Sequence, residues 1–241
     1  MRRALGYLWG TIIVLVLWWL LAILVNSPAL PTPLATLPDL ANNAPEIMPQ
    51  LGISFLRIVE AMAIGTILGA PLGLMLGRSQ RADAILGPVV YVLYPLPKIV
   101  ILPVLFVLFG IGGEAKVILI AIAVFFQMLV TMRDAAHDIP ASTIEAMRSL
   151  GANRVQMFIH VTIPATLPDL FTALRITTGT AVAILFIAES MAGSTGLGYY
   201  IMHAWSLLEY TQMFAGIVAF AILGVLLYEA FDFAERRLTR Q

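Results

Sequence analysis

Long apolar stretches alternate with short polar ones along the chain. Six of these stretches carry few charged residues and approach the roughly 20 residues that a helix needs to cross a bilayer. They cover residues 7–25, 53–76, 86–109, 116–132, 167–187 and 213–233. The charged residues lie mainly in the segments between them. This pattern predicts an all-α membrane protein with about six transmembrane helices.

Composition supports this class and excludes others. Of the 241 residues, 60% are hydrophobic and only 12% are charged, about half the charged share of a soluble domain. The net charge of zero provides no field that would attract nucleic acid. The chain has no cysteine, which excludes disulfides, thiolate metal sites and thiol nucleophiles. His137, His160 and His203 fall in different segments, so we expect neither a metal site nor a catalytic residue.

The basic residues predict the orientation. Lys and Arg in short loops stay on the cytoplasmic side, and placing both termini there also places the arginines of segments 77–85 and 133–166 there. Residues 7–25 follow Arg2 and Arg3 as in a secretory signal, but the apolar stretch is long and no clean cleavage site follows, so we interpret it as a retained helix. We therefore expect a multi-pass protein of a bacterial inner membrane with both termini in the cytoplasm.

The chain is expected to divide near residue 50. Residues 1–50 comprise the first helix and an outer connector, 26–50, whose six prolines make it too broken to form one helix. We expect at most one short helix there. Residues 51–241 then form the main transmembrane domain. Its outer segment 189–212 contains a glycine-rich turn at 193–198, which is either a simple loop or a re-entrant gate.

The long inner segment 133–166 predicts two short helices. Pro140 fits a first helical turn, and Ser142 with Glu145 three residues later fits a capping box. The first helix should run to Leu150, after which Gly151 supplies a left-handed stop.

The second short helix should begin at the cap Asn153 and end at Pro164, before the next span. Four residues recur at helical spacing along it: Val155, Phe158, Ile159 and Thr162. They predict a face that lies on the membrane body. Two short helices joined at a glycine would form a rigid cytoplasmic knob that docks into a groove on a soluble partner.

Within this segment a Glu-Ala-Met triplet is followed by three residues and a glycine and, nine residues later, by Val-x-Ile-Pro. The pattern resembles the EAA loop of permease subunits of binding-protein-dependent ABC importers. The matching positions are Glu145, Ala146, Met147, Gly151, Ile163 and Pro164. The resemblance implies that the loop 138–164 supplies a coupling helix to a separate ATPase. From the residues alone, Glu145 and Gly151 also have purely structural interpretations, as a cap and a helix stop.

Further motifs at 94–99, 109–114, 167–175 and 188–199 resemble the nitrate, sulfonate and taurine branch of these permeases. The resemblance implies a type I ABC importer (MetI-like) permease fold that acts as a homodimer in the lipid bilayer. Cytoplasmic ABC ATPase subunits would bind ATP and Mg, and a periplasmic or lipid-anchored solute-binding protein would deliver the solute. A small anion such as a sulfonate, taurine or nitrate is expected, and a pyrimidine precursor is the alternative.

The residues themselves argue against an activity of the chain alone. A P-loop needs a glycine before its lysine, and neither Lys98 nor Lys116 has one, so ATP hydrolysis is expected on another chain. A membrane enzyme would need ionisable groups clustered at one depth, and none is visible. A stand-alone ion-coupled carrier usually shows several mid-membrane acids or repeated halves, which are also not visible.

Four residues are candidates for the translocation pathway or its gate: Lys98, Arg175, Glu189 and Gly196. Lys98 lies among prolines in the third span, where a charge usually faces a bundle interior or a watery path. Each candidate also has an ordinary alternative: Lys98 and Arg175 could snorkel or pair structurally, Glu189 could be interfacial, and Gly196 could serve a simple turn.

Overall fold

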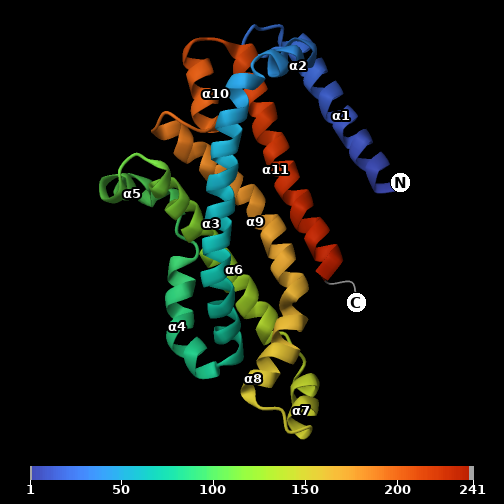
Figure 1. Ribbon diagram of the computed structural model, residues 1–241, viewed down its shortest axis with the longest axis vertical. Coiled ribbons are helices and arrows are strands. Elements are labelled where there is room, and N and C mark those ends of the chain that lie inside the picture. Colours follow the sequence, from blue (N-terminus) through green and yellow to red (C-terminus); the bar gives the residue numbers. More distant parts are fainter. Residues whose placement is uncertain (1, 239–241) are drawn as a thin grey trace. The chain divides into compact units, whose positions relative to one another are not determined.

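The computed structural model describes residues 2–238, which are almost entirely helical and contain no strand (Figure 1). The elements are α1 (Arg2–Val25), α2 (Pro33–Asn42), α3 (Ala44–Arg78), α4 (Gln80–Leu93), η1 (Lys98–Ile101), α5 (Leu102–Phe109), α6 (Gly113–His137), α7 (Ala141–Ser149), α8 (Arg154–Met157), η2 (Phe158–Thr162), α9 (Ile163–Met191), α10 (Leu197–Ser206) and α11 (Tyr210–Leu238).

The chain forms two compact units, and α3, α9 and α11 each continue from one into the other. Unit 1 comprises Met1–Ser54 and Glu189–Leu223, and unit 2 comprises Phe55–Ala188 and Gly224–Gln241. Unit 1 contains α1, α2 and α10, and unit 2 contains α4 to α8.

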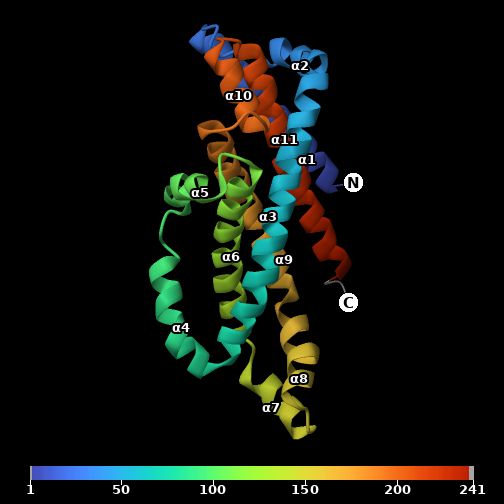
Figure 2. The ribbon, with the colours of Figure 1, turned by 60° about the vertical axis from the view of Figure 1, so that its left-hand side comes forward.

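Five of the predicted spans are confirmed as apolar helices long enough to cross a membrane: Gly6–Val25, Ala44–Arg78, Gly113–His137, Arg154–Met191 and Tyr210–Leu238. The predicted third span, 86–109, is not one continuous helix but a broken pair, which makes a sixth span if its two parts are taken together. Gln80–Leu93 and Lys98–Phe109 are bent by 80° relative to each other (Figure 2). Pro95 and Pro97 explain the break, because each lacks an N–H and disfavours helical geometry in the residue before it.

The connector 26–50 contains the one short helix that was expected, α2, whose N-cap Thr32 accepts a hydrogen bond from the backbone N–H of Ala35. Residues 44–50 were expected in the connector but belong to α3. Pro45 is the second residue of that helix, where its missing N–H removes no helical hydrogen bond.

In unit 2, α3 lies against α6 along a row of glycines spaced four apart: Gly65, Gly69, Gly73 and Gly77. A β-carbon at Gly69 would lie 2.5 Å from the Phe125 carbonyl oxygen, and one at Gly65 would lie 2.6 Å from Val124 Cβ. Only glycine allows this approach. Small residues at such spacing drive packing between membrane helices, where no hydrophobic effect favours association.

In unit 1, Trp18 joins α1 to the connector and to α11. Its indole N–H donates to the Pro31 carbonyl oxygen at 3.0 Å, and its ring stacks on Phe214 at 5.5 Å between centroids. Nearby α10 packs on α11, where Gly216 faces Tyr200 and Ile201. Contacts with α11 thus position both α1 and α10.

Candidate functional site

The inner segment begins with α7, whose start differs from the prediction. Pro140 is the N-cap residue with ψ of 134°, and no side chain caps the helix. The predicted capping box between Ser142 and Glu145 is wrong, because the helix starts at Ala141 and Ser142 already lies within its first turn. Glu145 is exposed and forms no side-chain hydrogen bond or ion pair with any described residue. Its carboxylate is therefore available to another protein.

The stop after α7 is confirmed at Gly151, whose φ is +78°. The Gly151 N–H donates to the Arg148 carbonyl oxygen at 2.9 Å, and the Ala152 N–H donates to the Met147 carbonyl oxygen at 3.1 Å. These two bonds form a Schellman motif, which satisfies the last carbonyls of the helix. No heavy atom lies within 4 Å of a β-carbon at this position, so the backbone conformation alone accounts for glycine.

The predicted cap of the second helix is confirmed. Asn153 accepts from the Gln156 N–H at 2.9 Å, and the Gln156 side chain accepts from the Asn153 N–H at 2.8 Å. The predicted end at Pro164 is wrong, because the helix continues from Arg154 to Met191. A π turn over Phe158–Thr162 ends two residues before Pro164, and this widened turn accommodates a residue without an N–H.

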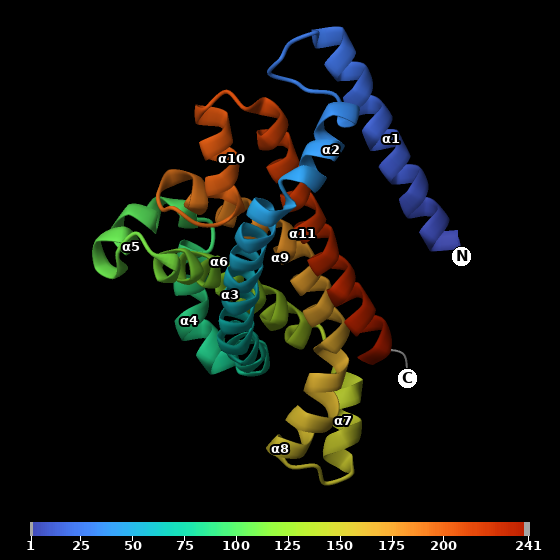
Figure 3. The ribbon, with the colours of Figure 1, turned by 45° about the horizontal axis from the view of Figure 1, so that its top comes forward.

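The prediction that one apolar face of this helix packs on the membrane body is wrong for most of the four residues. Val155 and Ile159 are 65% and 50% exposed, and Phe158 is 36% exposed, whereas Thr162 is buried. The packing against α7 is made by a different set: Ile139, Ile144 and Val161 are buried, with Met147 and Met157 packed against them. The resulting knob, α7 with α8, extends from the end of α9 (Figure 3) and presents apolar side chains outwards.

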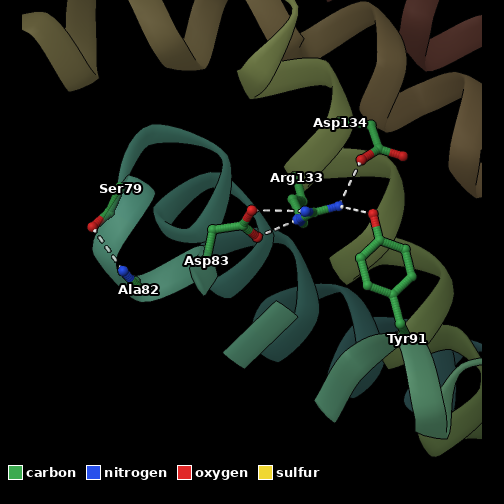
Figure 4. A network of polar contacts seen from close by, with 6 residues as sticks. All are labelled: Ser79, Ala82, Asp83, Tyr91, Arg133 and Asp134. Carbon is green, nitrogen blue, oxygen red and sulfur yellow. Dashed lines mark hydrogen bonds and ion pairs between the residues drawn. The ribbon is translucent and has the colours of Figure 1, made fainter. Parts of the chain in front are cut away.

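A charge cluster joins α6 to α4 a few residues before the knob (Figure 4). The Arg133 guanidinium donates from Nε to Asp83 Oδ1 at 2.5 Å and from Nη2 to Asp83 Oδ2 at 2.8 Å. Its Nη1 donates to the Tyr91 hydroxyl at 2.8 Å and to Asp134 Oδ1 at 3.2 Å. Sequence reasoning missed this site, because 50 residues separate Asp83 from Arg133 and no local pattern marks the pair.

Lys98 lies at the bend between α4 and η1. Its ammonium donates to the carbonyl oxygens of Leu93, at 3.1 Å, and Tyr94, and it lies 4.9 Å from the Phe126 ring centroid. In a continuous helix the Leu93 carbonyl would accept from residue 97, which is a proline with no N–H. The lysine thus caps the broken end of α4, where a cation is favoured by the helix dipole.

Glu189 and Gly196 are brought together in unit 1. The Glu189 side chain is 1% exposed and accepts from the Ser54 hydroxyl, at 3.0 and 2.9 Å to its two oxygens, and from the Gly198 N–H at 2.9 Å. Ser54 Oγ in turn accepts from the Leu197 N–H at 2.8 Å. Gly196 has a φ of +106°, and a β-carbon there would collide with the Glu189 carboxyl group. The carboxylate therefore holds the N-terminus of α10, where negative charge is favoured.

Helix α10 itself was not predicted, because it lies within a segment that reads as an outer loop. Ser54 and Gln50 were missed for the same reason, since they contact that loop only in the folded chain. Gln50 Oε1 accepts from the Gly196 N–H at 2.6 Å.

Arg175 is bound within unit 2. Its guanidinium lies 2.9 Å from Asp232 Oδ1 and 2.9 Å from Glu235 Oε2, and it donates to Thr172 Oγ1 at 3.2 Å. This arrangement favours the structural pairing that the sequence left open. In the described part of the chain, no group of three His, Asp or Glu residues could hold a metal ion.

An apolar cavity of about 210 Å³ lies between α3, α4 and α6, and Leu72, Val89 and Phe125 are among its lining residues. No polar surface lines it. It therefore offers nothing that would compensate the desolvation of an anion.

Comparison with known proteins now identifies the family. The model of binding-protein-dependent transport system inner membrane components matches residues 65–240. The chain belongs to this family. The taurine transport system permease protein TauC of Escherichia coli (strain K12) is 32% identical over 95% of this chain and 87% of its own length. The putative aliphatic sulfonates transport permease protein SsuC of Bacillus subtilis (strain 168) is 29% identical over 99% of this chain and 89% of its own length.

The fold matches as well. An inward-facing structure of the MetNI methionine ABC transporter superposes with a TM-score of 0.69, covering 80% of this chain and 96% of the matched chain at 23% identity. The chain is thus a multi-pass inner-membrane permease subunit of an ABC importer with the type I permease fold. It forms the membrane part of the transporter, and ATP hydrolysis belongs to a separate subunit.

Proposed function

We propose that this permease couples to its ATPase through the segment 138–164, with Glu145, Ala146, Met147 and Gly151 at the contact. The observation that carries this proposal is the continuity of α8, the π turn and α9 over Arg154–Met191, which joins the knob to a membrane helix without a loop. The exposed side chains of Glu145 and of Leu150, which is 81% exposed, give the knob a surface for a soluble partner. Ile163 and Pro164 then lie in the helix that transmits movement from the knob to the membrane.

In this mechanism ATP and Mg bind to the ATPase subunits, and nucleotide binding draws them together. The two knobs follow, and the membrane helices change from an inward-facing to an outward-facing arrangement. Nucleotide drives this change only as far as its affinity differs between the two states. The permease transmits that difference and works as a homodimer with two ATPase copies. Uphill transport by the permease reconstituted without an ATPase would contradict the proposal.

The test is Glu145→Ala with Ser142→Ala as the matched control, because both residues are exposed on α7 and both changes leave the helix intact. We expect Glu145→Ala to fold in the membrane, to recover less ATPase in mild detergent and to lose ATP-driven uptake. The control should behave as wild type. Unchanged complex yield and uptake in Glu145→Ala would refute the coupling role.

The substrate proposed is a small sulfonate such as taurine. The named relatives support this class, and Lys98 supplies a cation at the break of the third span. Two of the ammonium N–H groups are engaged by carbonyls, so a third remains for an anion. Lys98→Met should lower taurine uptake more than Lys98→Arg does. A solute-binding protein that instead retains a neutral pyrimidine precursor would refute the sulfonate assignment.

Both termini are proposed to be cytoplasmic, with the solute-binding protein on the opposite side. The absence of cysteine allows single-cysteine labelling of the otherwise native chain. Leu34→Cys and Leu150→Cys are suitable probes, because these side chains are 74% and 81% exposed. In spheroplasts, an impermeant maleimide should label position 34. It should leave position 150 unlabelled until the inner membrane is permeabilised. The reverse result would invert the topology.

A further inference from the structure

Helix α4 is joined to the rest of unit 2 by a break in the helix at each of its ends. On one side Ser79, whose backbone is extended with φ of −127° and ψ of 97°, separates it from α3. On the other side Pro95 and Pro97 separate it from η1. A helix of 14 residues between two such breaks can tilt as one rigid rod, about 21 Å long. Its position therefore depends on the contacts that its side chains make.

The apolar contacts of α4 with its neighbours are incomplete. Val90 is buried against Leu76 of α3 and Leu129 of α6, but the apolar cavity of about 210 Å³ lies beside these three residues. Leu86 and Val89, which line the cavity from α4, are 44% and 51% exposed. A cavity supplies fewer van der Waals contacts than close packing does. Polar contacts must therefore contribute to fixing the angle of α4.

One face of α4 receives the side chain of Arg133. Asp83, Gly87 and Tyr91 follow one another at intervals of four residues and so lie on the same face. Asp83 binds the guanidinium through both oxygens, and Tyr91 contacts it through its hydroxyl and its ring, whose centroid lies 5.1 Å from Cζ (Figure 4). A β-carbon at Gly87 would lie 3.2 Å from Asp83 Oδ1 and 3.9 Å from Arg133 Nη2, so glycine leaves space for the pair. The Arg133 side chain is only 16% exposed, which shields this bidentate pair from water.

Arg133 is also joined closely to the knob. Helix α6 ends about one turn after Arg133, and the three residues 138–140 connect it to α7. The middle one, Ile139, is buried with Ile144 and Val161 in the apolar cluster that packs α7. A connection this short, with its central side chain buried, is not a flexible linker. The knob and the end of α6 therefore move together.

We propose that Arg133 is the positioning residue through which the knob moves α4. The contact of Arg133 with Asp83, Gly87 and Tyr91, here named the Arg133 clamp, carries the start of α4 along with the end of α6 when the ATPase displaces the knob. The far end of α4 is capped by Lys98, so the same movement reaches the cation at the break. This inference rests on the proposed coupling function of the knob, and it adds a route to α4 besides the one along α9.

The experiment follows the knob and α4 separately, by electron paramagnetic resonance distances between two spin labels in the cysteine-free chain. Leu150→Cys with Val225→Cys reports the knob relative to α11, and Ile85→Cys with Val225→Cys reports the start of α4. The three native side chains are 81%, 60% and 73% exposed, in the order 150, 225 and 85. Labelled permease is diluted with unlabelled permease, so that each complex with the ATPase contains at most one labelled chain. Complex without nucleotide is compared with complex trapped by ATP and vanadate.

With the clamp intact, nucleotide should shift both distance distributions. In Arg133→Gln the knob distance should still shift, whereas the effect of nucleotide on the populations of the α4 distance should fall about fivefold or more, the lower end of coupling between sites. Gly87→Ala displaces Asp83 and removes no charge. It should act in the same direction without lowering the unfolding temperature, because alanine favours a helix more than glycine does. The charge exchange Asp83→Arg, Arg133→Asp should recover part of the α4 response, which a purely structural defect would not allow.

Arg81→Gln is the matched control. It removes an exposed arginine of α4 that forms no hydrogen bond or ion pair with any described residue, so both distances should respond as in wild type. If wild-type permease recovers no ATPase, or its knob distance ignores nucleotide, the proposed coupling function fails and the clamp with it. If the knob responds and the α4 distance shifts equally in wild type and Arg133→Gln, or in neither, the clamp is refuted while coupling through α9 stands. Loss of the α4 response in Arg81→Gln would also refute the clamp, because positive charge alone would then explain the effect.

Discussion

The bond network around Glu189 allows a quantitative test of what positions α10. In Glu189→Ala the Ser54 hydroxyl and the Gly198 N–H each lose a charged acceptor, at present 2.9 Å away. A hydrogen bond to a charged group contributes about 1.5–3 kcal/mol. The buried charge is removed together with its desolvation cost, so we take the lower end, about 3 kcal/mol in total. For a chain of this size that corresponds to a fall of roughly 6–12 °C in unfolding temperature.

The assay follows thermal unfolding by tryptophan fluorescence, to which Trp205 on α10 contributes directly. The unfolding temperature of Glu189→Gln should fall about half as far. Its amide oxygen still accepts from the Gly198 N–H, while its amide nitrogen faces the Ser54 hydroxyl. Glu209→Gln neutralises an exposed carboxylate of the same unit and should unfold as wild type does. A Glu189→Ala protein that unfolds within about 2 °C of wild type would refute the reasoning.

Three further changes test other parts of the chain. Gly69→Leu should reduce the yield of monodisperse protein in size-exclusion chromatography, because it forces α3 off α6, whereas Gly52→Leu on the same helix has nothing within 4 Å and should not. Asn153→Ala should destabilise the start of α8 by about 1 kcal/mol and speed hydrogen exchange there; unchanged exchange would contradict the capping box. Arg133→Gln should uncouple ATP hydrolysis from uptake. The double variant Asp83→Arg, Arg133→Asp, which exchanges the two charges, should restore part of the coupling. If the single and the double variant lose coupling equally, the ion pair has no role in transmission.

Local features of the candidate site could be predicted wherever the physics is local. The stop at Gly151 and the cap at Asn153 are confirmed because each depends on backbone geometry and side-chain reach within a few residues. The capping box at Ser142 failed because a motif four residues long does not determine at which residue a helix starts. Pro164 failed as a stop because the helix continues through a π turn and past it.

The apolar runs alone determined that the chain lies in a membrane and where its long helices fall, because burial of the backbone in lipid requires long helices irrespective of how they pack. Tertiary structure decided the rest. The pairing of Arg133 with Asp83 and the bonds of Glu189 with Ser54 each join residues far apart in the chain. Such contacts leave no periodic trace in the sequence, since they arise only when the packing of helices brings single polar groups within hydrogen-bond distance.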